Sequence, residues 1–341
     1  MKQQKVLVTG GLGYIGSHTV VELVNNGFEP IIVDDLSNSE MFILDRIEKI
    51  CSFRPKFYKA NLCDLTSIQQ LFQENNIDVV IHFAAFKAVG ESVKQPLKYF
   101  RNNLVSLINV LEAMEQHNCN KIIFSSSATI YGQPDVLPAT EHTAMQKALS
   151  AYGSTKQMGE DILEKVSATG KINTIALRYF NPVGAHHSAL IGELPKGIPN
   201  NLFPYVMQTA TGKLERLTVF GNDYNTKDGT ALRDYIHVVD LAKAHVKACE
   251  RLVNEKQDAA YEIFNIGTGK GTTVLEIIQT FEKVTGTPLN YIFGNRREGD
   301  AEAIYAETAK ANAVLNWEAV HTLEEMVMSS WKWEKGLSEN K

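Results

Sequence analysis

The first half of the chain alternates short runs rich in β-branched residues with longer segments in which apolar positions recur at helical spacing. Short apolar runs bounded by turn residues are typical of strands, and the longer amphipathic segments are typical of helices. Repeated strand–helix units predict a parallel sheet covered by helices on both faces. The predicted strands are 6–9, 30–33, 56–59, 79–83, 121–125 and 173–178, and the predicted helices between them are 14–26, 68–75 and 96–117.

Beyond about residue 180 the periodicity becomes weaker. Residues 181–201 are rich in Pro, Gly and His and show no period, which indicates a long functional loop. Smaller elements follow it: a helix from residue 203, a strand at 217–220, and helices at 239–253 and 274–283. We therefore expect an α/β fold with a doubly wound Rossmann-type parallel sheet in residues 1–180. Residues 181–341 should form a smaller α/β lobe packed against it, with some exchange of strands and helices between the two.

Composition and charge exclude several classes of function. The 341 residues carry a formal net charge of −5 and no run of Lys or Arg, so neither nucleic acid nor a membrane surface is an expected partner. The N-terminus leads directly into an apolar strand without the features of a signal peptide, and no apolar stretch approaches the ~18 residues of a membrane span. A reduced, cytoplasmic setting is expected. No metal site or disulfide framework is expected either, because the four cysteines are far apart: Cys51, Cys63, Cys119 and Cys249.

Three glycines mark the junction between the first predicted strand and the first predicted helix. Gly10, Gly13 and Gly16 are spaced as in dinucleotide-binding loops, where glycine lets backbone amides approach a pyrophosphate at a helix N-terminus. Asp34 ends the second predicted strand, at the distance where an acidic residue accepts from the adenosine ribose. With Asp35 it would repel a 2′-phosphate, which favours NAD over NADP. The alternatives are a plain glycine-rich turn and an exposed strand-end carboxylate.

Tyr152 and Lys156 stand four residues apart in the middle of the chain. On a helix this spacing places both side chains on one face. A nearby ammonium favours the phenolate and lowers the pKa of a tyrosine, so the pair can act as an acid–base unit. A surface pair with no function is the alternative for the motif in isolation.

Several separated stretches resemble one family from end to end. They read VTGGLGYIGSH, IHFAAFKAVGESV, FSSSATIYG, AYGSTK, RYFNPVGAH, GIPNNL, FGNDYNTKDGT, RDYIHV and RREGD. This set resembles the extended short-chain dehydrogenase/reductase superfamily and, within it, the UDP-glucose 4-epimerases. The match to many stretches is far more specific than any one motif.

The resemblance implies a catalytic set of Ser127, Tyr152 and Lys156, with Ser127 and Tyr152 facing the same sugar oxygen and Lys156 also reaching the nicotinamide ribose. Taken alone, a serine at a strand end is more often a capping group. The positions that the resemblance assigns to NAD are Gly10, Gly13, Tyr14, Ile15, Gly16, Asp34, Asn38, Ser39, Asn61, Leu62, Phe83, Ala84, Ala85, Lys87, Asn102, Tyr152, Lys156 and Tyr179. Those that it assigns to the nucleotide sugar are Lys87, Ser127, Tyr152, Asn181, Asn201, Leu202, Thr218, Phe220, Arg233, Tyr235, Val274, Arg297 and Asp300.

Some of these positions have alternatives or depart from the family. Arg233 and Arg297 could instead form surface salt bridges with their neighbours Asp234 and Glu298. Asn61 stands where the family usually has an aspartate that contacts the adenine. The residues after Asp300 also diverge, and a bulky Ile304 or Tyr305 at the sugar end would favour a simple hexose; the divergent residues are Ala301, Glu302, Ala303, Ile304 and Tyr305.

The resemblance implies reversible epimerisation of UDP-glucose and UDP-galactose at sugar carbon 4, through a transient 4-keto sugar and tightly bound NAD. It also implies a homodimer formed through paired long helices, here 96–117 and 152–166. Three other enzymatic activities remain as alternatives: a UDP-N-acetylhexosamine 4-epimerase, a plain NAD-dependent dehydrogenase and a sugar-nucleotide 4,6-dehydratase. The last is disfavoured because residues 127–130 offer no carboxylate. A non-catalytic NAD-binding regulator is a fourth alternative.

Overall fold

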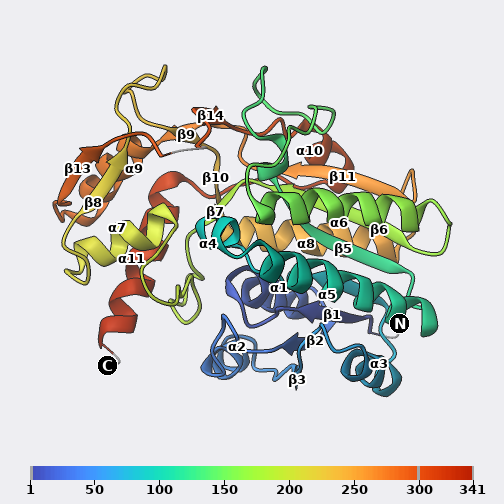
Figure 1. Ribbon diagram of the computed structural model, residues 1–341. Coiled ribbons are helices and arrows are strands. Elements are labelled where there is room, and N and C mark those ends of the chain that lie inside the picture. The colour runs from blue at the N-terminus through green and yellow to red at the C-terminus, as the bar shows by residue number, and fades with distance from the viewer. Residues whose placement is uncertain (1–2, 298–299, 340–341) are drawn as a thin grey trace.

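The larger lobe is built on a parallel sheet of seven strands (Figure 1). The computed structural model describes residues 3–297 and 300–339. Every neighbouring pair of strands in this sheet is parallel, in the order β11-β6-β5-β4-β1-β2-β3. The strands are β1 (Lys5–Thr9), β2 (Glu29–Asp34), β3 (Lys56–Lys59), β4 (Val79–His82), β5 (Lys121–Ser127), β6 (Asn173–Tyr179) and β11 (Tyr261–Ile266).

The chain reverses its direction of travel across the sheet between β1 and β4. From β1 it moves outward to β2 and β3, then returns to β4 and continues to β5 and β6 on the other side. At such a switch point the loops after the two central strands diverge and leave a crevice at their carboxyl ends. The predicted α/β class with a doubly wound parallel sheet is therefore confirmed, and the crevice lies beside the glycine-rich loop that follows β1.

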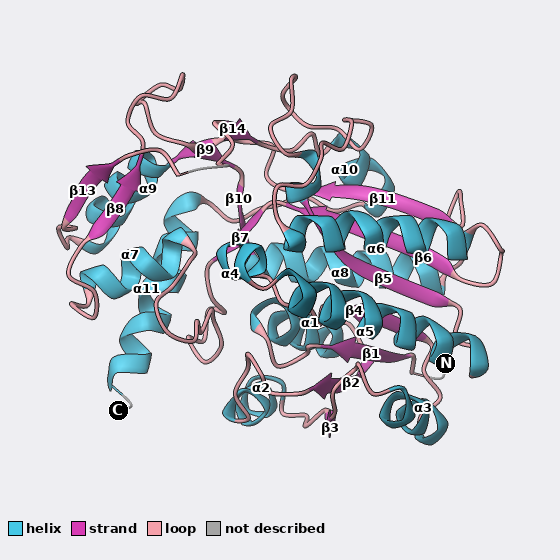
Figure 2. Cartoon of the chain, in the orientation of Figure 1, coloured by secondary structure: helices cyan, strands magenta, loops and turns pink. Residues whose placement is uncertain are grey.

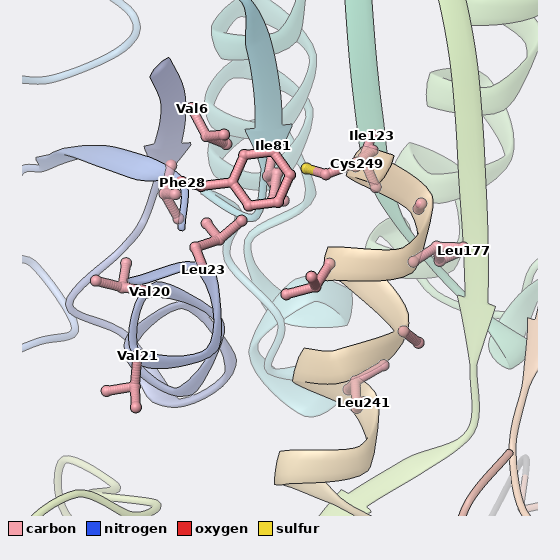
Figure 3. Close-up of a cluster of buried hydrophobic side chains, with 14 of the residues drawn as sticks. Val6, Val20, Val21, Leu23, Phe28, Ile81, Ile123, Leu177, Leu241 and Cys249 are labelled. Atoms are coloured by element: carbon pink, nitrogen blue, oxygen red, sulfur yellow. The ribbon is translucent and has the colours of Figure 1, made fainter. Parts of the chain in front are cut away.

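Helices cover both faces of the sheet (Figure 2). Successive side chains of a strand point to opposite faces, and accordingly Val6 and Val8 belong to one buried cluster while Leu7 belongs to the other. Figure 3 shows the first cluster, where Ile81 and Ile123 of the sheet face Leu23 and Leu241 of two helices. The helices on that face are α1 (Tyr14–Asn25), α2 (Phe42–Cys51) and α8 (Val238–Val253); those on the other are α3 (Leu65–Glu74), α5 (Pro96–Gln116) and α6 (Ala151–Ser167).

Two elements from the second half of the chain complete the larger lobe. The pattern places helix 239–253 in the second half of the chain, with some exchange of elements between the lobes expected; α8 packs against α1 and the sheet. The pattern does not predict β11, which pairs with β6 from Tyr261 opposite Thr174 to Ile266 opposite Tyr179. The sequence of β11, Tyr-Glu-Ile-Phe-Asn-Ile, places the polar residues Glu262 and Asn265 three apart, so it shows neither a continuous apolar run nor strict alternation.

The smaller lobe has a separate core formed by Phe203, Val219, Phe281 and Val327. Its helices are α7 (Leu202–Ala210), α9 (Val274–Thr285) and α11 (Leu323–Glu339), which pack on the parallel pair β8 (Leu217–Phe220) and β13 (Tyr291–Gly294). The remaining elements are short: α4 (Val89–Lys94), β7 (Asn181–Val183), β9 (Leu232–Arg233), β10 (Tyr235–His237), β12 (Thr272–Thr273), β14 (Ala303–Ile304), α10 (Ala309–Leu315) and a 3-10 turn at Ala128–Tyr131. Within the described ranges, no helix is both long enough and apolar enough to cross a membrane.

Candidate active site

One cleft of about 590 Å³ runs from the glycine-rich loop of the larger lobe to Arg233 and Arg297 of the smaller lobe. Every residue that the sequence analysis assigned to catalysis, to the cofactor or to the substrate lines it. The cleft therefore brings together the loop after β1 and side chains from β5, α6 and the short strands of the second half of the chain. In the part of the chain that the structure describes, no group of three or more His, Cys, Asp or Glu side chains is arranged to hold a metal ion.

The glycine-rich loop has no room for side chains at two of its positions. Gly10 has a φ of +67°, and a Cβ atom there would lie 3.1 Å from the backbone nitrogen of Ala84. A Cβ on Gly16 would lie 2.3 Å from the carbonyl oxygen of Gly10. Helix α1 then begins after Gly13 with no side-chain cap. Its first N–H groups and its positive dipole end are therefore suited to a phosphate group, as the sequence predicted.

Asp34 fixes the edge of this crevice. Its side chain is only 8% exposed, so it is not an exposed strand-end carboxylate. It accepts hydrogen bonds from the backbone N–H of Leu12 (3.1 Å) and Leu36 (3.0 Å) and from the Ser39 hydroxyl (2.7 Å). A carboxylate held in this way is preorganised at the end of β2, where a ribose would lie in a dinucleotide fold.

The side chain of Asn61 closes a local turn. Its Oδ1 accepts from the backbone N–H of Cys63 at 2.8 Å. The NH₂ group and one carbonyl lone pair remain for a ligand, whereas an aspartate here would offer only acceptors.

Tyr152 and Lys156 lie in the first turns of α6, as the four-residue spacing predicted, and Ser127 ends the neighbouring strand β5. Lys156 donates from Nζ to the carbonyl oxygen of Ser125 at 2.5 Å. Thr129 donates from Oγ1 to Oγ of Ser127 at 3.0 Å, which fixes the serine hydroxyl. The three predicted catalytic groups are thus held at one place by the strand, the turn after it and the helix.

The electrostatics of this group differ from the prediction in one respect. Burial raises the pKa of Tyr152, and a hydrogen bond with Ser127 partly opposes that shift. Burial also lowers the pKa of Lys156 to about 8, partly offset by Glu160. The expected lowering of the Tyr152 pKa by Lys156 is not seen, because burial of the phenol dominates. Nζ of Lys156 donates to the carbonyl oxygen of Ser125 and lies 5.8 Å from the centre of the Tyr152 ring.

Some residues of the cleft were missed by the sequence analysis. Ser125 lines the cleft and its hydroxyl is hydrogen-bonded to that of Tyr179, while Thr129 and Asn200 also reach the wall. The run of serines at 125–127 held the signal for the first of these. Residues two apart on a strand share a face, so Ser125 must point the same way as Ser127.

Arg233 and Arg297 lie at the far end of the cleft. Nη2 of Arg233 is 3.6 Å from Oδ1 of Asp300, and the guanidinium of Arg297 lies 4.5 Å from the centre of the Phe220 ring. The alternative ion pair between Arg233 and Asp234 is wrong. The Asp234 side chain is buried and accepts from the backbone N–H groups of residues 268, 269 and 306. Glu298, the alternative partner of Arg297, lies outside the described residues.

The prediction that Ile304 or Tyr305 lines the sugar end is also wrong. Neither belongs to the wall of the cleft. Strand β14 pairs with β9, which turns Ile304 inward against Ile130, Tyr131 and Phe180. These two side chains therefore give no basis for a preference between simple and N-acetylated hexoses.

Comparison with known proteins places this geometry in a family. Residues 7–330 match the family model described as GDP-mannose 4,6 dehydratase. The UDP-glucose 4-epimerase of Bacillus subtilis (strain 168) is 53% identical over 330 residues, which are 96% of each chain. Two solved UDP-glucose 4-epimerases are each 46% identical to this chain, and each alignment covers 99% of this chain and 100% of the solved chain. That of Stenotrophomonas maltophila, with bound NAD and formylated UDP-arabinopyranose, has a TM-score of 0.97. That of Bifidobacterium longum, in complex with NAD⁺ and UDP, has a TM-score of 0.94. The chain therefore belongs to the UDP-glucose 4-epimerase family of the extended short-chain dehydrogenase/reductase superfamily.

Proposed function

We propose that this protein interconverts UDP-glucose and UDP-galactose by inverting carbon 4 of the sugar, with NAD as its resident cofactor. The observation that carries the proposal is the shared cleft. In it, Ser127 and Tyr152 lie between a dinucleotide-type glycine loop and the arginines at the far end. The relatives described above, and the NAD and UDP in solved structures of this family, support the same activity.

The larger lobe supplies the cofactor site. Bound there, NAD would supply the acceptor for a hydride from carbon 4 of the sugar and the source from which that hydride returns. The N–H groups at the start of α1 would hold the diphosphate of the cofactor, and Asp34 would accept from its adenosine ribose. Asp34 and Asp35 both line this end of the cleft and disfavour a 2′-phosphate.

Tyr152 carries the proton chemistry of the proposed reaction. It takes the proton of the sugar 4-hydroxyl while Ser127 donates a hydrogen bond to the same oxygen, and it returns the proton after the 4-keto sugar has turned its other face. The sugar must therefore be held loosely and its nucleotide tightly. Arg233 and Arg297 are suited to that grip because a guanidinium can bind phosphate oxygens through two donors at once.

The dehydratase alternative has no support in the cleft. Elimination of water needs an acid–base carboxyl group beside the sugar, and the carboxylates among the described lining residues are those of Asp34, Asp35 and Asp300. None of them comes from the β5–α6 region. Glu160 on α6 is buried in an ion pair with Arg178, with 2.6 Å between Oε2 and Nη2. The catalytic group is thus suited to taking and returning one proton.

We further infer that the protein forms a homodimer through α5 and α6. The two helices pack side by side and leave Leu97 81% exposed, Ile108 40% exposed and Met158 44% exposed. Apolar side chains gathered on neighbouring helices are typical of a self-complementary interface. Light scattering should give twice the monomer mass for the native protein and the monomer mass for Leu97→Asp/Met158→Glu. A monomeric native protein would contradict the inference.

The decisive experiment incubates the purified protein with UDP-galactose without added NAD and separates the products. UDP-glucose should form, because the cofactor stays bound through a closed redox cycle and is not consumed. Parallel incubations with UDP-N-acetylgalactosamine and GDP-mannose test the N-acetylhexosamine and dehydratase alternatives. Absence of UDP-glucose, or accumulation of NADH with each turnover, would overturn the proposal.

A further inference from the structure

Glu193 lies just behind the wall of the cleft and is not one of the residues that line it. Its side chain is 13% exposed. It belongs to residues 184–201, which connect β7 to α7 and which we call the strap. A nearly buried carboxylate is costly unless it is paired and hydrogen-bonded. Its partners therefore show what it contributes.

The strap is fastened to the larger lobe on both sides of Glu193. Arg46 of α2 donates from Nη1 to the carbonyl oxygen of Leu190 at 3.0 Å. Lys196 donates from Nζ to the carbonyl oxygens of Leu36 (3.2 Å) and Ser37 (3.0 Å), in the loop after β2. These bonds hold the backbone on both sides of Glu193 against the elements that carry the cofactor end of the cleft.

The smaller lobe holds the same stretch of backbone. Trp333 of α11 donates from Nε1 to the carbonyl oxygen of Glu193 at 2.8 Å. The indole also packs so closely that a Cβ on Gly192 would lie 2.6 Å from its ring. The main chain at Glu193 is therefore fixed from both lobes, and the direction of its side chain follows from that.

Asn201 is the first partner of the Glu193 carboxylate. Its Nδ2 donates to Oε1 of Glu193 at 2.7 Å. Asn201 lines the cleft at the start of α7, among the positions proposed to contact the nucleotide sugar. Because the nitrogen of the amide is committed to Glu193, the amide cannot flip without losing a charge-assisted hydrogen bond. The orientation of this substrate-side group therefore depends on Glu193.

Lys87 is the second partner. Its Nζ lies 3.4 Å from the same Oε1 atom and 5.9 Å from the centre of the Tyr14 ring in the glycine-rich loop. Lys87 lines the cofactor side of the cleft and is 48% exposed, so this longer ion pair is weaker than the bond to Asn201. One oxygen thus touches a group from each side of the cleft.

We propose that Glu193 is a positioning residue of the epimerase reaction. Its carboxylate aligns Asn201 for the nucleotide sugar and holds Lys87 beside the glycine-rich loop, without touching either ligand. The inference rests on the proposed function. Most of the effect of Glu193 on binding of the nucleotide sugar comes from its hydrogen bond to Asn201, and its charge contributes the smaller part.

The test measures binding of UDP-galactose by calorimetry in the Tyr152→Phe background, where turnover is prevented. Glu193→Ala should weaken binding about tenfold, the usual effect of losing one charge-assisted hydrogen bond. Glu193→Gln should restore most of the affinity, because its amide oxygen can still accept from Asn201. The amount of NAD that co-purifies should fall only slightly in Glu193→Ala, since the glycine-rich loop is unchanged and the ion pair with Lys87 is the weaker of the two contacts.

A double-mutant cycle separates loss of the contact between Glu193 and Asn201 from a general loss of structure. With Asn201→Ala already present, Glu193→Ala should weaken binding much less than it does alone. Glu115→Gln is the matched control, because the exposed Glu115 carboxylate pairs with Lys171 at 3.5 Å on the surface. The affinity of this variant for UDP-galactose should be unchanged. Unchanged affinity of Glu193→Ala, equal losses in the Ala and Gln variants, or an additive cycle would each overturn the inference. None of these outcomes affects the proposed function, which is tested separately on the native protein by product analysis and by the accumulation of NADH.

Discussion

The two ends of the cleft are built from different kinds of chemical group. The larger-lobe end consists mainly of backbone, where β1 stops, the glycines turn and α1 begins. The smaller-lobe end consists of side chains, with Arg233 on a strand of two residues and Arg297 after β13. A backbone site is specified by the fold and fails when a side chain intrudes. A side-chain site is specified residue by residue and can be altered one contact at a time.

Tyr152→Phe tests whether the chemistry belongs to the larger lobe alone. We expect kcat to fall by about a thousandfold, because Tyr152 is the residue proposed to exchange the proton of the 4-hydroxyl. Retained NAD and unchanged binding of UDP by calorimetry would show that both ends still function. A variant that keeps native activity would contradict the assignment of Tyr152.

Gly16→Ala tests whether the cofactor end depends on backbone. The added methyl group would lie 2.3 Å from the carbonyl oxygen of Gly10, so the loop must move. We expect the purified variant to lose almost all of its NAD and its activity while it still binds UDP at the other end. Gly90→Ala is the matched control, because a Cβ there meets no atom within 4 Å. Retention of NAD by Gly16→Ala would show that the loop is more tolerant than its packing indicates.

Arg233→Ala tests whether the smaller-lobe end of the cleft depends on individual side chains. Loss of a charged donor to a phosphate should raise KM for UDP-galactose about tenfold to a hundredfold, with NAD content and fold unchanged. Arg296→Ala is the control, because Arg296 is exposed, pairs with Asp223 at 2.7 Å and does not line the cleft. If the two variants have the same KM, the arginine end does not hold the nucleotide.

The smallest expected effect concerns a contact between the two halves. His321, in the segment leading to α11, bonds from Nδ1 to Oδ1 of Asp240 in α8 at 2.8 Å, and this bond raises the pKa of the imidazole above 6.5. A raised pKa gives stability that is present below pH 6.5 and is lost as the pH rises through the folded-state value. The native protein should therefore melt at a higher temperature than His321→Gln at pH 6. This difference in melting temperature should be about 1–2 °C larger at pH 6 than at pH 8. An equal difference at the two pH values would contradict this.

The sequence predicted the cofactor half in more structural detail than the substrate half. The strand that starts at Lys56 and the helices that start at Tyr14 and Pro96 begin where the pattern placed them, because regular alternation of strands and helices leaves few alternatives. The pattern also placed the strand at 217–220 and the helix from 274, but the site residues of the second half were assigned only through the resemblance to a family. Strands of two or three residues such as β9 and β10 have no period to detect.

The predictions that were wrong depend on features of the folded chain that the sequence pattern does not show. The pKa of Tyr152 is raised chiefly by burial, which depends on how the folded chain packs around the phenol and has no sequence signature. The position of Ile304 depends on the pairing of β14 with β9, which turns the side chain inward. Glu193 stands in a loop with no period, and its importance arises only from two partners more than seven residues away.

The way α8 and β11 return to the larger lobe affects how this architecture can evolve and be engineered. The chain leaves the sheet after β6, builds part of the smaller lobe, and then returns to cover one face and one edge of the sheet it left. A fragment ending near residue 180 would expose the apolar surface that α8 buries and an unpaired edge along β6. The nucleotide-sugar half therefore cannot be replaced as one unit by the corresponding half of another protein. New specificity must come from single substitutions in its short strands and loops, within a framework that the cofactor half requires for its own folding.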